Sequence, residues 1–300
     1  MERKCFAKIE FRVVNGESCR VEQDIKLKNI CSFLPSEPVT LFYEYPLKVI
    51  IPSSASDSCC QWVYPITFGG GLVEGDCMDI IIRISRKCCV LSTTMSSPKV
   101  YICEKGKDSQ QHTKYFIDSE ALMCVLPDPL VCYEKSSYIQ SQTFHLESDG
   151  NLVLLDWFTS GRYSCGERWV FTKLKSMSSI FINGKLQFRE CQNMQDTPFV
   201  SLKAANKSYD IIGTCIVIGP YLKFLYSEML SKLGKCRAYG EKPDKESLFA
   251  VSPLHSNGES RICGCIIRFA AVSVPETIRR LEELLQPLFA IIGDNPFAKK

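Results

Sequence analysis

The sequence predicts a mainly β (α+β) fold, with a β-rich body over about residues 1–210 and a mixed α/β part over about residues 211–300. Short runs in which apolar and polar residues alternate recur through the first two thirds of the chain. Pairs of Asn or Asp with Gly, which favour tight turns, separate several of these runs. Leucine-rich segments with helical spacing follow only after about residue 210. Many strands joined by turns favour an all-β body over repeated βαβ units.

The body strands are predicted from alternation and from the turns that bound it. Residues 8–13 alternate apolar with charged side chains, and Asn15-Gly16 then predicts a hairpin turn. Further hairpins are predicted at Asp149-Gly150 and at Asn183-Gly184. Additional strands are expected near residues 39–44, 61–68, 88–94, 99–103, 114–118, 121–126 and 168–174.

The C-terminal part mixes strands with helices. Residues 211–218 are uniformly apolar and predict a buried strand, and Gly219-Pro220 then opens a helix, because Pro is tolerated in the first helical turn. This helix carries apolar residues at helical spacing and ends at a glycine suited to a C-terminal cap: Leu222, Leu225, Met229, Leu233 and Gly234. Two more strands are expected over residues 248–253 and 261–271.

The last helix has the clearest start signal. Ser273 and Glu276 have the spacing of a capping box, in which the hydroxyl accepts from the backbone N–H three residues on and the carboxylate reaches back. One face of the helix carries an apolar stripe: Ile278, Leu281, Leu284, Leu285 and Leu288. We interpret this stripe as core packing rather than as an exposed face for a partner.

Composition and charge exclude several classes of function. The 300 residues carry a net charge of only +3 without clustered Lys and Arg, so no nucleic-acid partner is expected. No apolar run is long enough to span a membrane, and the N-terminus leads into strand-like alternation rather than a signal-peptide core. We therefore expect one cytoplasmic domain over residues 1–300, with no membrane partner.

The cysteines fit a reduced chain. There are 17 cysteines, an odd number, and no Cys-x-x-Cys motif, so they are interpreted as small apolar side chains. Cys263 and Cys265 lie two apart on a predicted strand and face the same side, so a soft site for Ni²⁺ or Zn²⁺ is conceivable there. Because no further ligands are evident, core packing is the preferred interpretation.

Catalytic equipment is sparse. The three histidines, His112, His145 and His255, are too scattered to form a His-x-x-x-His zinc pair. No nucleophile elbow, phosphate-binding loop or dinucleotide-binding glycine motif is present. We therefore predict that the chain is not an enzyme and has no catalytic residues.

The carboxylates after residue 150 are the more informative polar groups. Asp156 shares a strand face with apolar residues, where a carboxylate is costly unless it is paired or hydrated. Arg162, after the turn at Gly161, is its candidate partner, and Glu167 precedes Trp169 on a predicted strand. These groups form either a structural ion pair that fixes a bend or a polar passage whose oxygen ligands would suit a metal in transit.

A glycine-rich connection lies earlier in the chain, with Gly69, Gly70, Gly71 and Gly75 just before Asp76. A strand rather than a helix follows, so the glycines shape a strand-to-strand connection and a phosphate-binding interpretation is weak. Asp76 either caps this turn or lines a polar path. Lys99 either contacts a partner or flanks a strand.

An ordered series of motifs now resembles a known family. The series runs from Pro46-Leu47-Lys48-Val49 through residues 69–76, 93–101, 126–129, 156–162 and 166–169, with fainter matches at 252–254 and at Arg268. In this order the motifs resemble the UreD/UreH family of urease accessory proteins over roughly residues 6–297. The resemblance implies a many-stranded, stacked, β-helix-like sheet body with two α-helices near the C-terminus.

The resemblance also implies a function. Members of this family are non-enzymatic scaffolds that help load nickel into apo-urease, together with a helical accessory protein (UreF-type) and a nickel-delivering GTPase (UreG-type). It implies transient Ni²⁺ rather than a tightly bound cofactor, and a polar tunnel as the nickel route. Asp76, Asp156, Arg162 and Glu167 lie in matching motifs and are placed near that route. The matching motifs also contain Gly69, Gly70, Gly71, Gly75, Lys99, Trp157, Gly161 and Trp169.

The chain departs from the family pattern at several places, among them the C-terminal ending Asn295-Pro296-Phe297-Ala298-Lys299-Lys300 and two places within the motifs. Glu74 stands where the family usually has a second glycine, and Pro98 removes a backbone donor after an unusual Met95-Ser96-Ser97 segment. Two other functions remain open on the residues alone. One is a β-fold hydrolase that uses Asp156 and Glu167 as paired carboxylates, and the other is a metal-storage protein that uses the cysteines.

Overall fold

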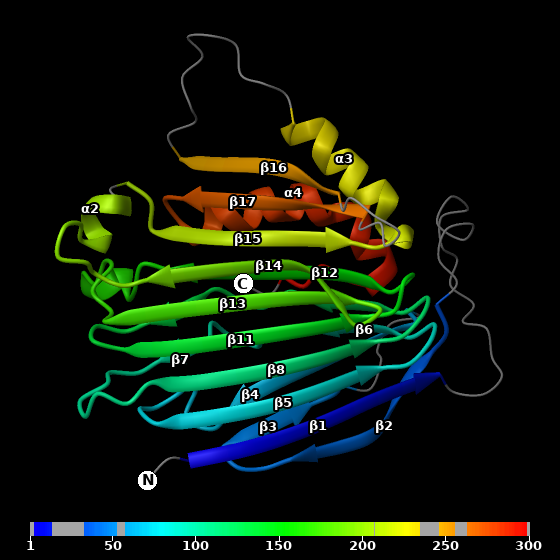
Figure 1. The fold of residues 1–300 in the computed structure, drawn as a ribbon, viewed down its shortest axis with the longest axis horizontal. Coiled ribbons are helices and arrows are strands. Elements are labelled where there is room, and N and C mark those ends of the chain that lie inside the picture. Colours follow the sequence, from blue (N-terminus) through cyan, green and yellow to red (C-terminus); the bar gives the residue numbers. More distant parts are fainter. Residues whose placement is uncertain are drawn as a thin grey trace.

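The structure, a computed structural model, describes residues 3–13, 33–52, 58–206, 208–234, 246–255 and 263–298. The predicted Asn15-Gly16 hairpin and its return strand lie outside these ranges. Two stacked β-sheets form the described body, with helices beside one of them (Figure 1). The fold is therefore mainly β and solenoid-like, as predicted.

One sheet has seven strands in the order β14-β13-β11-β8-β5-β1-β2. Its bounds along the chain are β1 Arg3–Val13, β2 Ser36–Tyr43, β5 Asp76–Ile84, β8 Ser109–Ile117, β11 Ser137–Leu146, β13 Lys173–Ile182 and β14 Lys185–Met194. From β1 to β13 every neighbouring pair is parallel, and the outer strands β2 and β14 add antiparallel pairs at the two edges.

The other sheet has ten strands, eight of them in the order β16-β17-β15-β12-β9-β6-β4-β3, with β10 and β7 attached beside β12. Its bounds are β3 Leu47–Ile50, β4 Cys60–Thr67, β6 Cys89–Ser92, β7 Lys99–Val100, β9 Leu122–Val125, β10 Leu130–Cys132, β12 Asn151–Thr159, β15 Ile211–Ile218, β16 Ser247–His255 and β17 Cys263–Ala271. The strands predicted over 211–218 and 248–253 are thus confirmed, as is the one predicted over 261–271 from Cys263 onward, and all three extend the body's sheet.

The chain alternates between the sheets, from β5 to β6, β8, β9, β11, β12 and β13. Each circuit lays its strands parallel to the previous circuit, as β8 does between β5 and β11. This alternation explains why the predicted hairpin at Asp149-Gly150 is wrong. The turn leaves β11 in one sheet and enters β12 in the other, so the two strands do not pair with each other.

Two other turns test the sequence interpretation. Asn183-Gly184 does form an antiparallel hairpin, and both residues adopt the positive φ (49° and 76°) that such turns require. The strand predicted over 168–174 begins only at Lys173, because Trp169 adopts a left-handed φ of 57° that ends any extended run. The strand expected over 99–103 is limited to Lys99–Val100.

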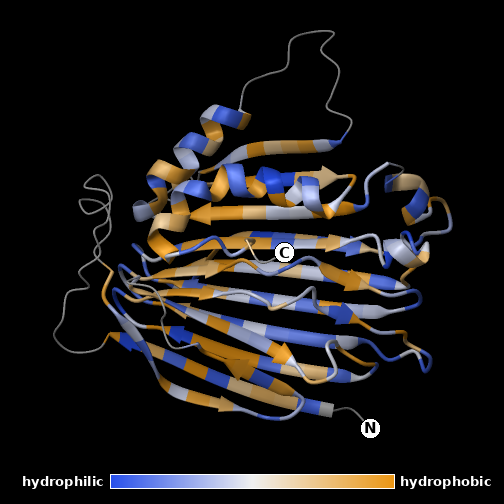
Figure 2. Ribbon diagram, turned by 180° about the vertical axis from the view of Figure 1, so that it is seen from behind, coloured by the Kyte–Doolittle hydropathy of each residue, from blue (hydrophilic) through white to orange (hydrophobic). Residues whose placement is uncertain are grey.

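Two apolar layers follow from strand alternation, which Figure 2 shows as alternating colours along many strands. The inner faces of the two sheets pack against each other around a cluster that includes Ile80, Phe144 and Leu154. The outer face of the ten-stranded sheet packs on helices through a second cluster, to which Leu155 and Leu285 belong. Successive residues of β12 thus serve different cores.

The helices are α2 (Leu202–Asn206), α3 (Lys223–Leu233) and α4 (Val274–Ile292), with short 3₁₀ turns at Tyr163–Cys165 and Pro220–Leu222. The two predicted helices correspond to α3 and α4, whereas α2 was not predicted. The apolar stripe of α4 is confirmed as core, since Leu281, Leu284, Leu285 and Leu288 are buried and Ile278 packs on the same cluster. No described helix is long and apolar enough to cross a bilayer.

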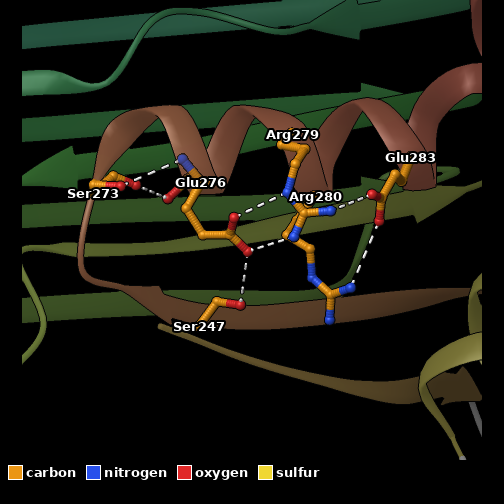
Figure 3. A network of polar contacts seen from close by, with 7 residues as sticks. Ser247, Ser273, Glu276, Arg279, Arg280 and Glu283 are labelled. Carbon is orange, nitrogen blue, oxygen red and sulfur yellow. Dashed lines mark hydrogen bonds and ion pairs between the residues drawn. The ribbon is translucent and has the colours of Figure 1, made fainter. Parts of the chain in front are cut away.

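The predicted capping box is half realised (Figure 3). Ser273 Oγ accepts from the backbone N–H of Glu276 at 3.4 Å. The Glu276 carboxylate instead accepts from Arg279 at 2.8 Å and from Ser247 Oγ at 3.3 Å, so it joins α4 to β16. The helix start is therefore tied both to itself and to the sheet below.

Replacing the capping serine tests this assignment. Ser273→Ala should lower the free energy of unfolding by about 1 kcal/mol, because a backbone N–H at the start of α4 loses its acceptor. Urea unfolding measures the change. Glu283→Ala on the exposed face of the same helix is the control and should cost less than about 0.5 kcal/mol. Equal losses in the two variants would contradict the capping role.

Candidate functional site

A polar cavity of about 130 Å³ lies between the two sheets. Its walls come from the inner faces of β5, β8 and β11 on one side and of β6, β9 and β12 on the other. The polar lining residues include Thr67, Ser92, Thr93, Thr94, Lys99, Gln111, Thr113, Asp128, Gln140, Gln142 and Asp156. An interior otherwise filled by aliphatic side chains thus contains a space bordered by both polar and apolar side chains.

The parallel register explains how the amides gather. Gln140 on β11 lies opposite Gln111 on β8, and two residues further along Gln142 lies opposite Thr113. Residues two apart on a strand share a face, so all four side chains point inward as a polar row. Sequence reasoning missed this row, because it depends on the pairing of strands about thirty residues apart.

Besides Asp128, Asp156 supplies a carboxylate to the cavity. It lies on the inner face of β12 with Leu154 and Phe158, as the alternation predicted. Its Oδ2 accepts from Ser176 Oγ at 2.5 Å and its Oδ1 accepts from Gln140 Nε2 at 3.2 Å. The side chain is surrounded by protein but keeps accessible surface, because it borders the cavity.

Burial raises the pKa of Asp156 above its usual value, against the two hydrogen bonds, which lower it. The two hydrogen bonds favour the ionised form, but the pKa is raised overall, so the loss of water around the carboxylate has the larger effect. The burial of Tyr115 raises its pKa too, and the Asp156 charge adds to that effect. Asp156 is therefore a carboxyl whose proton is held more tightly than in water.

The predicted pairing of Asp156 with Arg162 is wrong. Arg162 Nε donates to Glu167 Oε2 at 2.9 Å, and a second guanidinium nitrogen contacts Glu167 Oε1. The Glu134 backbone N–H also donates to Glu167, and the guanidinium lies 4.1 Å from the ring centre of Tyr133. Arg162 holds the pKa of Glu167 below its usual value. Of the two interpretations of these residues, the Arg162–Glu167 pair fits the structural ion pair that fixes a bend.

The chain reverses at Gly161 to reach that pair. Gly161 has a φ of 138°, and a Cβ there would lie 3.1 Å from the Glu167 carbonyl oxygen. The Trp169 backbone N–H donates to Ser160 O at 2.6 Å and its indole to Tyr209 O at 3.1 Å, which closes the loop. Trp157 lies before the turn, and its indole donates to Pro127 O at 2.8 Å near the cavity.

A second ion pair in this loop was not predicted. Arg168 pairs with the buried Asp210, whose other oxygen accepts from Ser160 Oγ at 2.9 Å. The partner lies 42 residues further along the chain, so local sequence spacing carried no signal for it. Together the two ion pairs fix residues 160–169 beside a surface pocket of about 670 Å³.

Lys99 borders both the surface pocket and the interior cavity. Beside it, Thr94 Oγ1 donates to Asp128 Oδ2 at 2.9 Å and accepts from the Asp128 backbone N–H at 2.7 Å. Asp128 lies in the family motif at residues 126–129, but it was not predicted as a site residue from the sequence. Lys99, Thr94 and Asp128 thus surround the end of the cavity that lies toward the pocket.

The glycine-rich connection packs against Lys99, as its unusual backbone predicted. A Cβ on Gly71 would lie 2.5 Å from the Lys99 carbonyl oxygen, so only glycine fits. Gly69, Gly70 and Gly75 adopt positive φ values of 89°, 75° and 81°. The Leu72 N–H donates to Lys99 O at 2.8 Å, which joins the connection to β7.

Asp76 caps the connection. Its Oδ2 accepts from the Val73 backbone N–H at 3.0 Å. This bond corresponds to the turn-capping role, one of the two roles considered for Asp76 from the sequence. The buried Oδ1 has no hydrogen-bond partner among the described residues, and Asp76 does not border the cavity. Asp76 and Glu167 therefore lie outside the cavity that Asp156 lines.

Glu74, the departure from the family glycine, anchors a neighbouring loop. Its carboxylate accepts from the backbone N–H groups of Glu104, Lys105 and Lys107 at 2.7–2.9 Å. These bonds, led by that from Lys107, lower the pKa of Glu74 to about 2. A residue that differs from the family pattern thus gains a local structural role.

The other candidate metal and catalytic groups do not assemble as hypothesised. Cys265 is buried beside Met229, with 3.9 Å between the sulfurs, whereas Cys263 is exposed at the start of β17. Among the described residues no third metal-binding group joins these two. Asp156 and Glu167 do not face a common cavity, so the paired carboxylates of a glycoside hydrolase are not formed.

The stacked two-sheet β body agrees with the fold that the sequence resemblance implied. Comparison with known sequences identifies the family. The family model described as UreD urease accessory protein matches residues 30–299, and the chain belongs to this family. Family membership supports a role in urease maturation.

Three relatives illustrate the similarity. Urease accessory protein D of Oryza sativa subsp. indica is 31% identical over 85% of this chain and 89% of its own length. The protein of the same name from Arabidopsis thaliana is 31% identical over 88% of this chain and 95% of its own length. Urease accessory protein UreD of Sorangium cellulosum is 30% identical over 85% of this chain and 77% of its own length.

The raised pKa of Asp156 gives a stability prediction. A carboxyl whose pKa is higher in the folded state destabilises that state when ionised, and this cost disappears as the pH falls below the unfolded value of 3.8. Asp156→Asn should therefore match or exceed the wild-type free energy of unfolding at pH 7, and any gain should shrink toward pH 4. Urea unfolding across this range measures it. A gain that grows with acidification would contradict the account.

Proposed function

We propose that this chain is a non-enzymatic scaffold of urease maturation that helps deliver nickel to apo-urease in the cytosol. Membership of the UreD family supports a role in urease maturation. The observation that carries the nickel step is the placement of Asp156, whose carboxylate borders the interior cavity and accepts from Ser176 and Gln140 rather than from an arginine.

The chemistry of the cavity suits an ion that passes through it. Oxygen ligands bind Ni²⁺ less tightly and release it more readily than a closed thiolate cage. Asp156 provides one negative oxygen ligand, and Gln111, Gln142 and Thr113 provide neutral oxygens within the same lining. A volume of about 130 Å³ holds several waters, which can complete the coordination of an ion in transit.

The way into the cavity lies at the residues shared with the surface pocket. Lys99 borders both spaces, and Gly71 lets the backbone of the glycine-rich connection pack directly against it. Arg162 lines the surface pocket while it is held by Glu167. In this proposal Asp156 is the interior ligand, Lys99 lies at the entrance, and Asp76, Arg162 and Glu167 shape the backbone around the route.

The proposed partners are a helical accessory protein of UreF type, a nickel-delivering GTPase of UreG type and apo-urease. A scaffold brings the GTPase and apo-urease together, and nickel crosses the scaffold between them. In this proposal nickel is cargo, bound transiently, and the scaffold has no resident cofactor. Co-purification of the four components on one affinity-tagged chain tests the assembly.

The nickel step is tested by Asp156→Asn in cells that lack their own UreD protein. The variant keeps the size of the side chain but removes the charge. Urease activity at limiting nickel should fall several-fold relative to wild type, while the four components still co-purify. Added nickel should restore much of the loss, because a weaker ligand is offset by a higher concentration of the ion.

Asp108→Asn is the matched control. Asp108 is also a half-buried aspartate that accepts from a serine, Ser137 at 2.5 Å; it pairs in addition with Lys173 at 2.8 Å and does not border the cavity. This variant should support urease activity like wild type. Activity of Asp156→Asn equal to that of Asp108→Asn at every nickel concentration would contradict the nickel step. If the wild-type chain failed to co-purify with the other three components, the scaffold proposal itself would be contradicted.

A further inference from the structure

We propose that Cys77, Asp79 and His112 form a second, separate site for a divalent transition-metal ion on the outward face of the seven-stranded sheet. One potential ligand atom from each residue lies within 4.8 Å of the other two. Among the described residues, these three form the one group of three or more Cys, His, Asp or Glu side chains with such spacing. None of the three was predicted as a metal ligand from the sequence.

Strand geometry brings the three side chains together. Cys77 and Asp79 lie two apart on β5, so they project from the same face. β8 runs parallel to β5, and His112 is directly opposite Asp79 in the register. Buried Met78 and Ile80 alternate with them and point into the core, so the cluster faces outward. Two paired central strands thus hold the ligands on a rigid frame.

The ligand set favours a borderline divalent ion. A thiolate, an imidazole and a carboxylate are the ligands of Zn²⁺, Ni²⁺ and Co²⁺ sites, with metal–ligand distances of about 2.0–2.3 Å. Three protein ligands leave a fourth position for water, as in exchangeable and catalytic sites rather than closed structural ones. All three residues are half-buried, so an ion can reach them from solvent.

The local charges also suit a cation. A thiolate and a carboxylate together carry two negative charges, which a divalent ion neutralises. At present the Lys4 ammonium lies 3.1 Å from Asp79 Oδ2 and provides part of that compensation. The Lys4 side chain is 73% exposed and can move into solvent at little cost. Lys4 is therefore a competitor that a divalent ion can displace.

His112 has a neighbour of the kind that orients metal-bound histidines. Its Nε2 lies 3.3 Å from Gln110 Oε1. In the neutral tautomer that donates from Nε2 to this oxygen, the lone pair is on Nδ1. Metal-binding histidines commonly donate their second N–H to a carbonyl or carboxylate in this way, which fixes the tautomer.

This site is distinct from the proposed nickel route. None of the three residues borders the cavity, which opens on the opposite face of β5 and β8. The inward residues of these strands, Ile80 and Thr113, line the cavity, whereas Asp79 and His112 alternate away from them. The inference therefore does not rest on the proposed function.

The test is a Co²⁺ titration of the reduced, metal-free full-length chain, followed by the thiolate-to-metal charge-transfer absorption. The wild type should bind one Co²⁺ with such a band, and Zn²⁺ should displace it. Cys77→Ser should abolish the band, and His112→Gln should weaken binding by at least about tenfold, since even second-shell changes cost 10–100-fold in affinity. Lys4→Gln should tighten binding.

Cys191→Ser is the control, because Cys191 is an exposed cysteine on β14 of the same sheet. It should leave the band and the stoichiometry unchanged. Circular dichroism confirms that each variant is folded. The proposal is overturned if Cys77→Ser and His112→Gln fold and bind Co²⁺ like wild type, or if Cys191→Ser removes the band instead.

Discussion

The main constraint on the interior is a carboxylate, Asp156, held between two largely apolar sheets. An ionised carboxylate in an apolar interior would cost many kcal/mol without partners, so it must be hydrogen-bonded or hydrated. Ser176 and Gln140 each donate one hydrogen bond, yet burial still raises its pKa, so the compensation is incomplete. The carboxylate also borders the cavity and keeps accessible surface there. An apolar residue at this position would avoid the cost, and this is why the nickel-transfer proposal is centred on Asp156.

In the parallel sheet, side chains at equivalent positions of neighbouring strands line up in rows. Because β8 and β11 pair in parallel register, inward polar residues of the two strands form a continuous row, as Gln111 and Gln140 show. The parallel register of β5 and β8 places His112 beside Asp79 on the outward face. A stacked β body can therefore carry two chemically different sites on the two faces of one sheet, each held by backbone pairing rather than by loops.

Much of the fold was predictable from the sequence, because strand alternation and helix capping are local signals. Strand 211–218, the Asn183-Gly184 hairpin and the inward face of Asp156 were all predicted correctly. The turn at Asp149-Gly150 was misassigned, because a turn between two sheets has the same residues as a turn within one. The partner of Asp156 was misassigned as Arg162, because the reversal at Gly161 sends Arg162 to Glu167. Pairs that depend on distant register, such as Asp79 with His112, carry no local signal.

The most direct test of the central claim is a crystal structure of the chain soaked in Ni²⁺, with anomalous diffraction recorded at the nickel edge. The account predicts ordered water in the cavity and a nickel peak within bonding distance of an Asp156 oxygen. A dry cavity without a nickel peak, in which Ser176 and Gln140 are the only partners of Asp156, would contradict it.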